Sequence, residues 1–155
     1  MKTIVIGLGN PILGNDGIGR KVAEEVKQCV GARPDVEVDC VSLGGISLME
    51  RLIGYDYAIL IDAFQSEKAS GSVLVMNLDD VPNYSAFHTT NAHDTSLQNA
   101  LEVGKKLGEK LPGHVMVVGV ATEANFEFSE ELTPDVRAAV PLAAQAVLEL
   151  LQTSK

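Results

Sequence analysis

A glycine-rich stretch near the start of the chain constrains the fold most strongly. Residues 7–19 read G-L-G-N-P-I-L-G-N-D-G-I-G and lie between an apolar run, Thr3–Ile6, and a helical pattern that begins near Ile18. An apolar strand, a glycine-rich bend and a helix form the first unit of an open α/β sheet. The sequence therefore predicts that the chain starts with a buried strand and turns directly into a helix.

The same stretch matches neither of the common phosphate-binding motifs. The dinucleotide fingerprint G-x-G-x-x-G needs a third glycine where this chain has Ile12, and the G-K-[ST] tripeptide of a P-loop does not occur. Instead, Asp16 lies at the expected entrance of the helix. A carboxylate there would repel a phosphate, so a cation is the expected ligand at this bend.

Hydrophobic periodicity along the chain predicts the order βαβαββαβα, without repeats or linkers. The expected strands cover 2–8, 36–42, 57–61, 72–78 and 114–121, and the expected helices cover 17–30, 47–54, 94–110 and the segment from 133 onward. Tyr57–Ile61 is the most apolar run and is expected to be a central strand that stops at Asp62. The connection Gln65–Gly71 is too short for a parallel crossover, which favours an antiparallel pair of flanking strands. The predicted fold is one domain, 1–155, built as a three-layer α/β/α sandwich.

Size and composition limit the function. The chain has 155 residues and a net charge of −9, which disfavours a nucleic-acid partner. It lacks an apolar run of the roughly 18 residues that a membrane span needs, and Thr3–Ile6 is too short to be the core of a signal peptide. Cys29 lies in a helical pattern and Cys40 in a strand pattern, so both are expected to be buried apolar side chains rather than a disulfide. This cysteine usage predicts a cytoplasmic protein.

Three side chains are candidate metal ligands because each is expected at the carboxyl ends of the strands, where open α/β sheets bind their ligands. Asp16 follows the first strand, Asp62 follows the central strand, and His93 precedes the third helix. Two carboxylates and an imidazole suit Ni²⁺, Zn²⁺ or Mn²⁺. Three protein ligands leave a coordination position open, as functional metal sites do.

Each candidate also has a purely structural interpretation. Asp16 could be the N-cap of the first helix, Asp62 a turn residue that ends a strand, and His93 a surface histidine. His88 is a competing ligand, whereas His114 begins a strand and should lie at the opposite, amino end of the sheet. The chain has neither a G-x-S-x-G elbow nor an H-E-x-x-H helix. If the protein cleaves a bond, a metal or its water is therefore the expected agent.

The motifs together resemble one known family. The opening stretch 7–19, the tripeptide I-D-A at 61–63, the tripeptide A-H-D at 92–94 and the segment L-M-E-R-L-I-G-Y-D at 48–56 are similar to the hydrogenase maturation endopeptidases. The likeness extends from Lys2 to about Leu151.

This resemblance implies a specific reaction. Such proteins remove a short C-terminal peptide from the precursor of the large subunit of nickel–iron hydrogenase, after the metal centre has been inserted. Two acids and a histidine of the protease sense the nickel, which cysteine thiolates of the substrate hold. The matching positions are Asp16, Asp62 and His93, so these residues are the expected catalytic and metal-contacting residues, and the nickel is expected to come with the substrate.

The resemblance also implies a fold and reveals one departure. The family has a mixed, mostly parallel five-stranded sheet between helices, with one antiparallel strand, in agreement with the short connection after Asp62. Many members carry Gly-hydrophobic-Glu/Gln-Pro after the last strand, whereas this chain has G-V-A-T-E at 119–123. A family role for that turn is therefore not carried over to this chain.

Two other functions stay open at this point. The opening motif also resembles peptidyl-tRNA hydrolase, a family with a catalytic histidine about ten residues after its Asn. Here Arg20 stands ten residues after Asn10, and no histidine is nearby. The chain also lacks the excess of basic residues that tRNA binding needs. The second alternative is a non-catalytic nickel-binding module. Three scattered histidines are few for a nickel carrier, which would normally contain a histidine-rich tract.

Overall fold

A computed structural model describes residues 1–10, 14–65, 68–81, 96–122 and 131–153. Its five-stranded sheet has the order β2-β1-β3-β5-β4. The strands are β1 (Thr3–Leu8), β2 (Val36–Val41), β3 (Tyr57–Gln65), β4 (Val73–Asn77) and β5 (His114–Thr122). All neighbouring strands pair in parallel except β4, which is antiparallel to β5. The predicted mixed sheet with one antiparallel strand is therefore confirmed.

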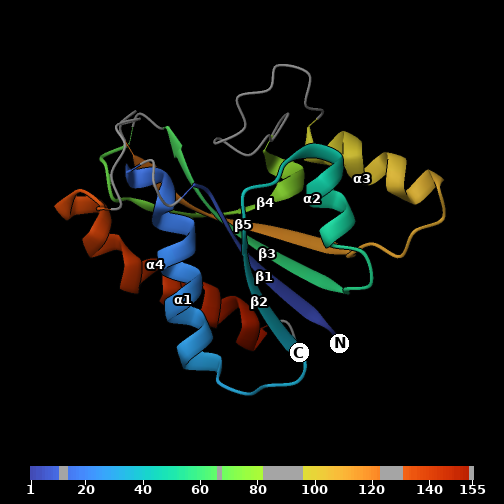
Figure 1. Ribbon diagram of the computed structural model, residues 1–155, viewed down its shortest axis with the longest axis horizontal. Helices are drawn as coiled ribbons and strands as arrows, with labels where there is room; N and C mark the ends of the chain where they lie inside the picture. Colours follow the sequence, from blue (N-terminus) through green and yellow to red (C-terminus); the bar gives the residue numbers. More distant parts are fainter. Residues whose placement is uncertain (11–13, 66–67, 82–95, 123–130, 154–155) are drawn as a thin grey trace.

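Helices cover both faces of this sheet (Figure 1). The α-helices are α1 (Ile18–Val30), α2 (Gly45–Arg51), α3 (Leu97–Lys106) and α4 (Pro134–Thr153), and the short 3-10 helices are η1 (Gly14–Gly17) and η2 (Leu78–Asp80). Helices α1 and α4 lie on one face, and α2 and α3 lie on the other (Figure 1). This arrangement confirms the predicted three-layer α/β/α sandwich.

Alternation along β3 assigns its side chains to two cores. Ile59 and Ile61 pack with α1 and α4, whereas Ala58 and Leu60 pack with α2 and α3. All four side chains are fully buried. Because both faces are covered, the strand reads as a continuous apolar run rather than as an alternating one. This explains why the central strand could be recognised from its sequence.

Several details differ from the sequence-based expectations. Strand β3 does not stop at Asp62 but continues to Gln65. The order of strands, which the sequence does not fix, places β4 beside β5. Ser96 caps α3, whose start the sequence had placed at Asp94, and its side chain accepts a hydrogen bond from the Asn99 N–H. Asp94 itself lies outside the described residues. The added residues of β3 pair with β5, so sheet pairing extends the strand past the point where its apolar run ends.

The cysteine prediction was wrong in part. Cys29 is exposed on α1, whereas Cys40 is half-buried on β2. Burial is the main cause that raises the pKa of the Cys40 thiol, which keeps it protonated near neutral pH. Both cysteines are free thiols.

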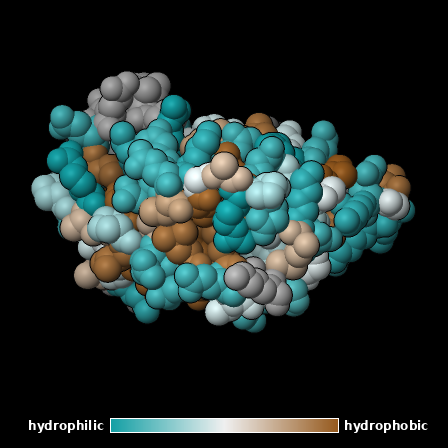
Figure 2. All heavy atoms as spheres, turned by 90° about the horizontal axis from the view of Figure 1, so that it is seen from below, coloured by the Kyte–Doolittle hydropathy of each residue, from teal (hydrophilic) through white to brown (hydrophobic). Residues whose placement is uncertain are grey.

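The surface agrees with the composition. Hydrophilic side chains cover most of the face seen from below, with an apolar area near its middle (Figure 2). Within the described residues, no helix is both long and apolar enough to cross a bilayer.

A carboxylate at the start of α4 makes folding stability depend on pH. The Asp135 carboxylate accepts hydrogen bonds from the Thr133 hydroxyl at 2.6 Å and from the Val136 N–H at 3.0 Å. Hydrogen bonding, first of all by Thr133, lowers the pKa of Asp135 below its ordinary value of 3.8. Its stabilising effect is therefore complete above that value and disappears as pH falls through the lower pKa of the folded state.

We expect Asp135→Asn to lower the free energy of unfolding at neutral pH, because the amide cannot replace a charged acceptor. The difference from the wild type should shrink as the pH falls below the ordinary value of 3.8 and through the lower pKa of the folded state. Urea unfolding at neutral and at acidic pH measures both values. A difference that stays the same at both pH values would contradict the assigned role of the carboxylate.

Candidate active site

Two glycines allow the bend after β1 to pack tightly against the sheet. A Cβ atom at Gly19 would lie 2.3 Å from the Leu8 carbonyl oxygen and 2.6 Å from the Ile61 carbonyl oxygen. Gly9 has a φ of +135°, and a Cβ atom there would lie 1.9 Å from the Asp16 carbonyl oxygen. The first turn of α1 therefore rests directly on the carboxyl end of β1 and on the middle of β3.

Asp16 lies within this bend, in η1. Its side chain is only 7% exposed, and its Oδ2 accepts a hydrogen bond of 2.7 Å from the Asn10 N–H. The N-cap position of α1 is occupied by Gly17, so the interpretation of Asp16 as the helix cap was wrong. The carboxylate instead binds the backbone immediately after β1, which fixes it at the carboxyl edge of the sheet.

Asp62 lies on β3 and is 1% exposed. The preceding residue, Ile61, pairs with Gly7 of β1, and Asp62 itself pairs with Gly119 of β5. Its side chain points to the same face as Leu60, toward α2 and α3, because alternate residues of a strand share a face. Asp62 is therefore an acid embedded in the sheet, with a glycine beside it on β5.

The bend brings the two acids to the same edge of the sheet. The 3-10 helix η1, which contains Asp16, contacts β3, which contains Asp62. Both side chains are buried although they come from positions 46 residues apart in the sequence. Two buried carboxylates at one edge of a sheet are candidates for a functional role.

Of the three histidines, the structure describes His114. His93 and the competing candidate His88 lie outside the described residues. His114 begins β5 at the amino edge, as predicted, and it is exposed. In the part of the chain that the structure describes, no three His, Cys, Asp or Glu side chains form a group that could hold a metal ion. The three-ligand set therefore stays a prediction, with its two acids at one edge.

Sequence reasoning missed one residue that positions the site. Asn15 is 4% exposed; its Oδ1 accepts a hydrogen bond of 2.9 Å from the Thr133 N–H, and its Nδ2 donates one of 3.2 Å to the Thr133 hydroxyl. These bonds tie η1 to the residue before α4. The available signal was a polar side chain directly before Asp16 in an otherwise glycine-rich bend. Asn15 thus holds in place the turn that carries the first acid.

The segment 119–123, where the sequence departs from the family pattern, lies partly in a strand. Gly119 and the three residues after it belong to β5 itself, up to Thr122, rather than to a turn after the strand. Glu123 lies outside the described residues. The position that pairs with Asp62 is therefore a strand glycine in this chain.

Comparison with known proteins places this geometry in a family. The sequence model of the hydrogenase maturation protease family matches residues 3–150. The hydrogenase 2 maturation protease of Escherichia coli is 30% identical, with 99% of this chain and 93% of the relative covered. A hydrogenase expression/formation protein, HupD of Thiocapsa roseopersicina, is 24% identical over 96% of this chain and 66% of its own length.

Solved structures agree with the sequence comparison. The hydrogenase maturating endopeptidase HybD from Escherichia coli superposes with a TM-score of 0.81 at 27% identity, covering 99% of this chain and 94% of that chain. A hydrogenase 2 maturation peptidase from a Thaumarchaeota archaeon superposes with a TM-score of 0.68 at 27% identity, covering 97% and 98%. With a family match over almost its whole length and the same fold, the chain belongs to the hydrogenase maturation protease family, a family of peptidases.

Proposed function

We propose that this protein is the endopeptidase that removes a C-terminal peptide from the nickel-loaded precursor of a nickel–iron hydrogenase large subunit. The observation that carries the proposal is the placement of two buried carboxylates, Asp16 and Asp62, at one edge of the sheet. Family membership supports the peptidase activity and a hydrogenase precursor as its substrate.

The nickel belongs to the substrate in this proposal. Carboxylate oxygens and an imidazole nitrogen are suitable ligands for Ni²⁺, and the thiolates of the precursor hold the ion from its other side. The protease supplies an incomplete ligand set from Asp16, Asp62 and His93, which the metal of the precursor completes. A metal-free precursor then binds less well, because specificity is a difference between two affinities.

The position of His93 in the sequence is compatible with this role. It lies three residues before Ser96, which caps α3. The next residue, Leu97, is buried in the same core as Leu8 and Leu60, the strand residue two positions before Asp62. In the sequence, His93 is thus only four positions from a residue of the core that also contains Leu60.

We expect His93→Ala to lower kcat/KM for the nickel-loaded precursor by about a hundredfold, because one neutral ligand to the ion is lost. The matched control is His114→Ala, which removes an exposed imidazole at the opposite edge of the sheet. The control should process the precursor at the wild-type rate, and both variants should keep the wild-type melting temperature. Equal activity of the His93 variant and the control would overturn the assigned role of His93.

The nickel-carrier alternative predicts a different binding result. A carrier binds Ni²⁺ tightly by itself, whereas a protease that reads the metal of its substrate has only part of a coordination shell. Equilibrium dialysis of the protein with Ni²⁺ alone is therefore expected to give weak binding. Tight binding of one ion per chain without precursor would favour the carrier instead.

A further inference from the structure

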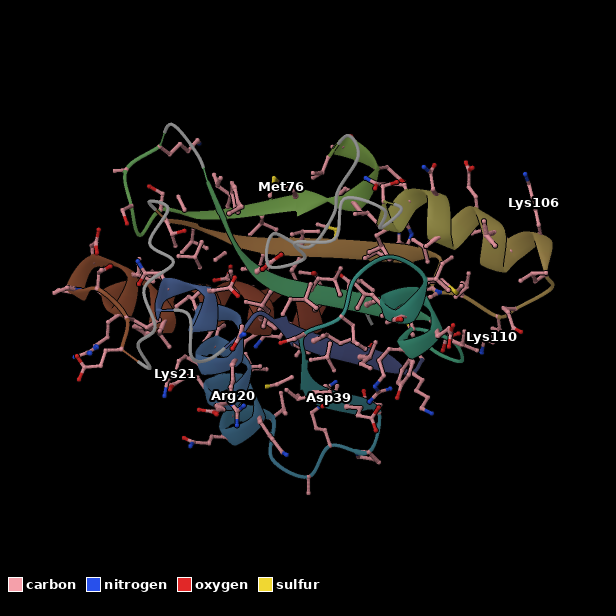
Figure 3. The ribbon with its side chains drawn as sticks, turned by 45° about the horizontal axis from the view of Figure 1, so that its top comes forward. Arg20, Lys21, Asp39, Met76, Lys106 and Lys110 are labelled. Atoms are coloured by element: carbon pink, nitrogen blue, oxygen red, sulfur yellow. The ribbon has the colours of Figure 1, made fainter. Side chains whose placement is uncertain are left out.

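The two edge strands of the sheet, β2 and β4, differ in how they are protected against pairing with a further strand. On β2, Glu37 and Asp39 form ion pairs with Arg51 of α2, at 3.1 Å and 2.9 Å. Charged side chains of this kind discourage another strand from pairing with an edge. On β4, at the opposite margin, the sequence is V-L-V-M-N, with no charge and no proline, and Val75 is 48% exposed. Figure 3 shows these margins, with Asp39 labelled on β2 and Met76 on β4.

The register of β4 shows which of its backbone groups face outward. The Ala121 N–H donates a hydrogen bond of 2.9 Å to the Ser72 carbonyl oxygen. In the same register, Val73 pairs with Val120, Leu74 with Gly119 and Val75 with Val118. Because hydrogen-bonded and non-hydrogen-bonded pairs alternate in an antiparallel ladder, the N–H and C=O groups of Val73 and Val75 point away from β5.

Strand β4 lies in register with Asp62, one of the two acids. Asp62 pairs with Gly119, and Gly119 pairs with Leu74, so the three residues form one row across the sheet. Two strand spacings separate Asp62 from Leu74, a distance of about 10 Å. The buried carboxylate and the edge strand β4 therefore lie in the same row of the sheet, with β5 between them.

An apolar surface fills the space between them. A Cβ atom at Gly119 would lie 1.9 Å from Cε1 of the Phe64 ring, so the ring occupies the space that a side chain would take. Phe64 and Leu74 are both half-buried and share the face of Asp62. An extended peptide bound along β4 would thus form hydrogen bonds with the outward N–H and C=O groups of this strand. The side chains of Phe64 and Leu74 form the apolar surface between this peptide and Asp62.

We propose, on the basis of the proposed function, that an extended segment of the precursor next to the scissile bond binds to β4 as a sixth strand. Main-chain hydrogen bonds to Val73 and Val75 supply affinity, as in other complexes in which a peptide adds to a sheet edge. The Val73 end of β4 is at the edge that carries the acids, since Val73 pairs with Val120 next to Gly119. The other end is followed by the exposed Asp79 and Asp80, which favour a basic side chain in the bound segment.

A second copy of the protein fits this edge less well. Each copy carries a net charge of −9, which opposes self-association. A strand of five residues is about 17 Å long, and edge pairing over this length buries far less than the roughly 1,200 Å² of a stable interface. A precursor segment does not need that area, because binding of the nickel at the acids raises its effective concentration at β4.

The test uses two substitutions at one position and the nickel-loaded large-subunit precursor as the probe. Val75→Pro removes an outward N–H and leaves the inward bonds of Leu74 in place, which edge strands tolerate. Val75→Thr keeps the N–H and the branched shape and serves as the matched control. We expect Val75→Pro to raise KM about tenfold with little change in kcat, and Val75→Thr to behave like the wild type.

Hydrogen exchange of the wild-type protein keeps the proposal testable if Val75→Pro does not fold. Saturating precursor should slow exchange at the Val73 and Val75 amides and leave the amides of β2 unchanged. Unchanged exchange on β4, or a folded Val75→Pro variant with wild-type KM, would overturn the proposal. A wild-type dimer that Val75→Pro dissociates without altering cleavage would assign the edge to a second copy and would overturn it too. If the wild-type protein cleaves no precursor at all, the proposed function itself fails.

Discussion

Asp62→Asn is expected to reduce kcat/KM for the nickel-loaded precursor at least about a thousandfold, equivalent to about 4 kcal/mol. The substitution keeps the size of the side chain but replaces the charged carboxylate, the proposed nickel ligand, with a neutral amide. Asp62 is 1% exposed and lies within β3, so solvent cannot easily supply a substitute ligand in the same position. Mass measurement of the released peptide over time gives the rate.

The control for this variant is Glu25→Gln, which makes the same change of charge at an exposed position in α1. It should retain the wild-type rate. Circular dichroism and thermal melting should show that both variants are folded. Substantial processing by a folded Asp62→Asn variant would remove this carboxylate from the proposed site.

Gly19→Ala is expected to lower the free energy of unfolding by about 3 kcal/mol or more, or to prevent folding. The new methyl group would lie 2.3 Å from the Leu8 carbonyl oxygen and 2.6 Å from the Ile61 carbonyl oxygen. Both contacts are with backbone atoms of a sheet, which cannot move aside as a flexible side chain could. Relief of the clash would require α1 to move away from β1 and β3, and η1 with Asp16 would move with it.

Gly113→Ala provides the comparison for this loss of stability. A Cβ atom at Gly113 meets no atom within 4 Å, and the residue is not among those with a positive φ. We expect its stability to be unchanged or raised by up to about 1 kcal/mol, because alanine restricts the unfolded chain. Urea unfolding measures both variants. Similar stabilities for Gly19→Ala and Gly113→Ala would contradict the close packing of α1 against β1 and β3.

The sequence was sufficient to predict most of the fold because its strongest signals are local. Tyr57–Ile61 is buried on both faces and could therefore be recognised as a central strand from its apolar run alone. The glycine-rich bend likewise predicted a strand followed closely by a helix. The position of β4 beside β5 could not be predicted, because strand order depends on pairing between distant segments.

The candidate site was predictable only as a set of residues. The sequence placed Asp16 and Asp62 near strand ends, and the structure brings them to one edge through the contact of η1 with β3. It did not predict that β3 continues past Asp62, because pairing with β5 through Gly119 overrides the end of the apolar run. Nor did it predict the role of Asn15, whose partner Thr133 lies 118 residues away.

The most direct test of the account compares nickel-loaded precursor with metal-free precursor under otherwise identical conditions. The wild-type protein should release one C-terminal peptide from the loaded precursor and leave the metal-free precursor intact, as mass spectrometry would show. Asp16→Asn and Asp62→Asn should abolish the release. Equal cleavage of both precursors would contradict the claim that two buried acids at the carboxyl edge read the nickel of the substrate.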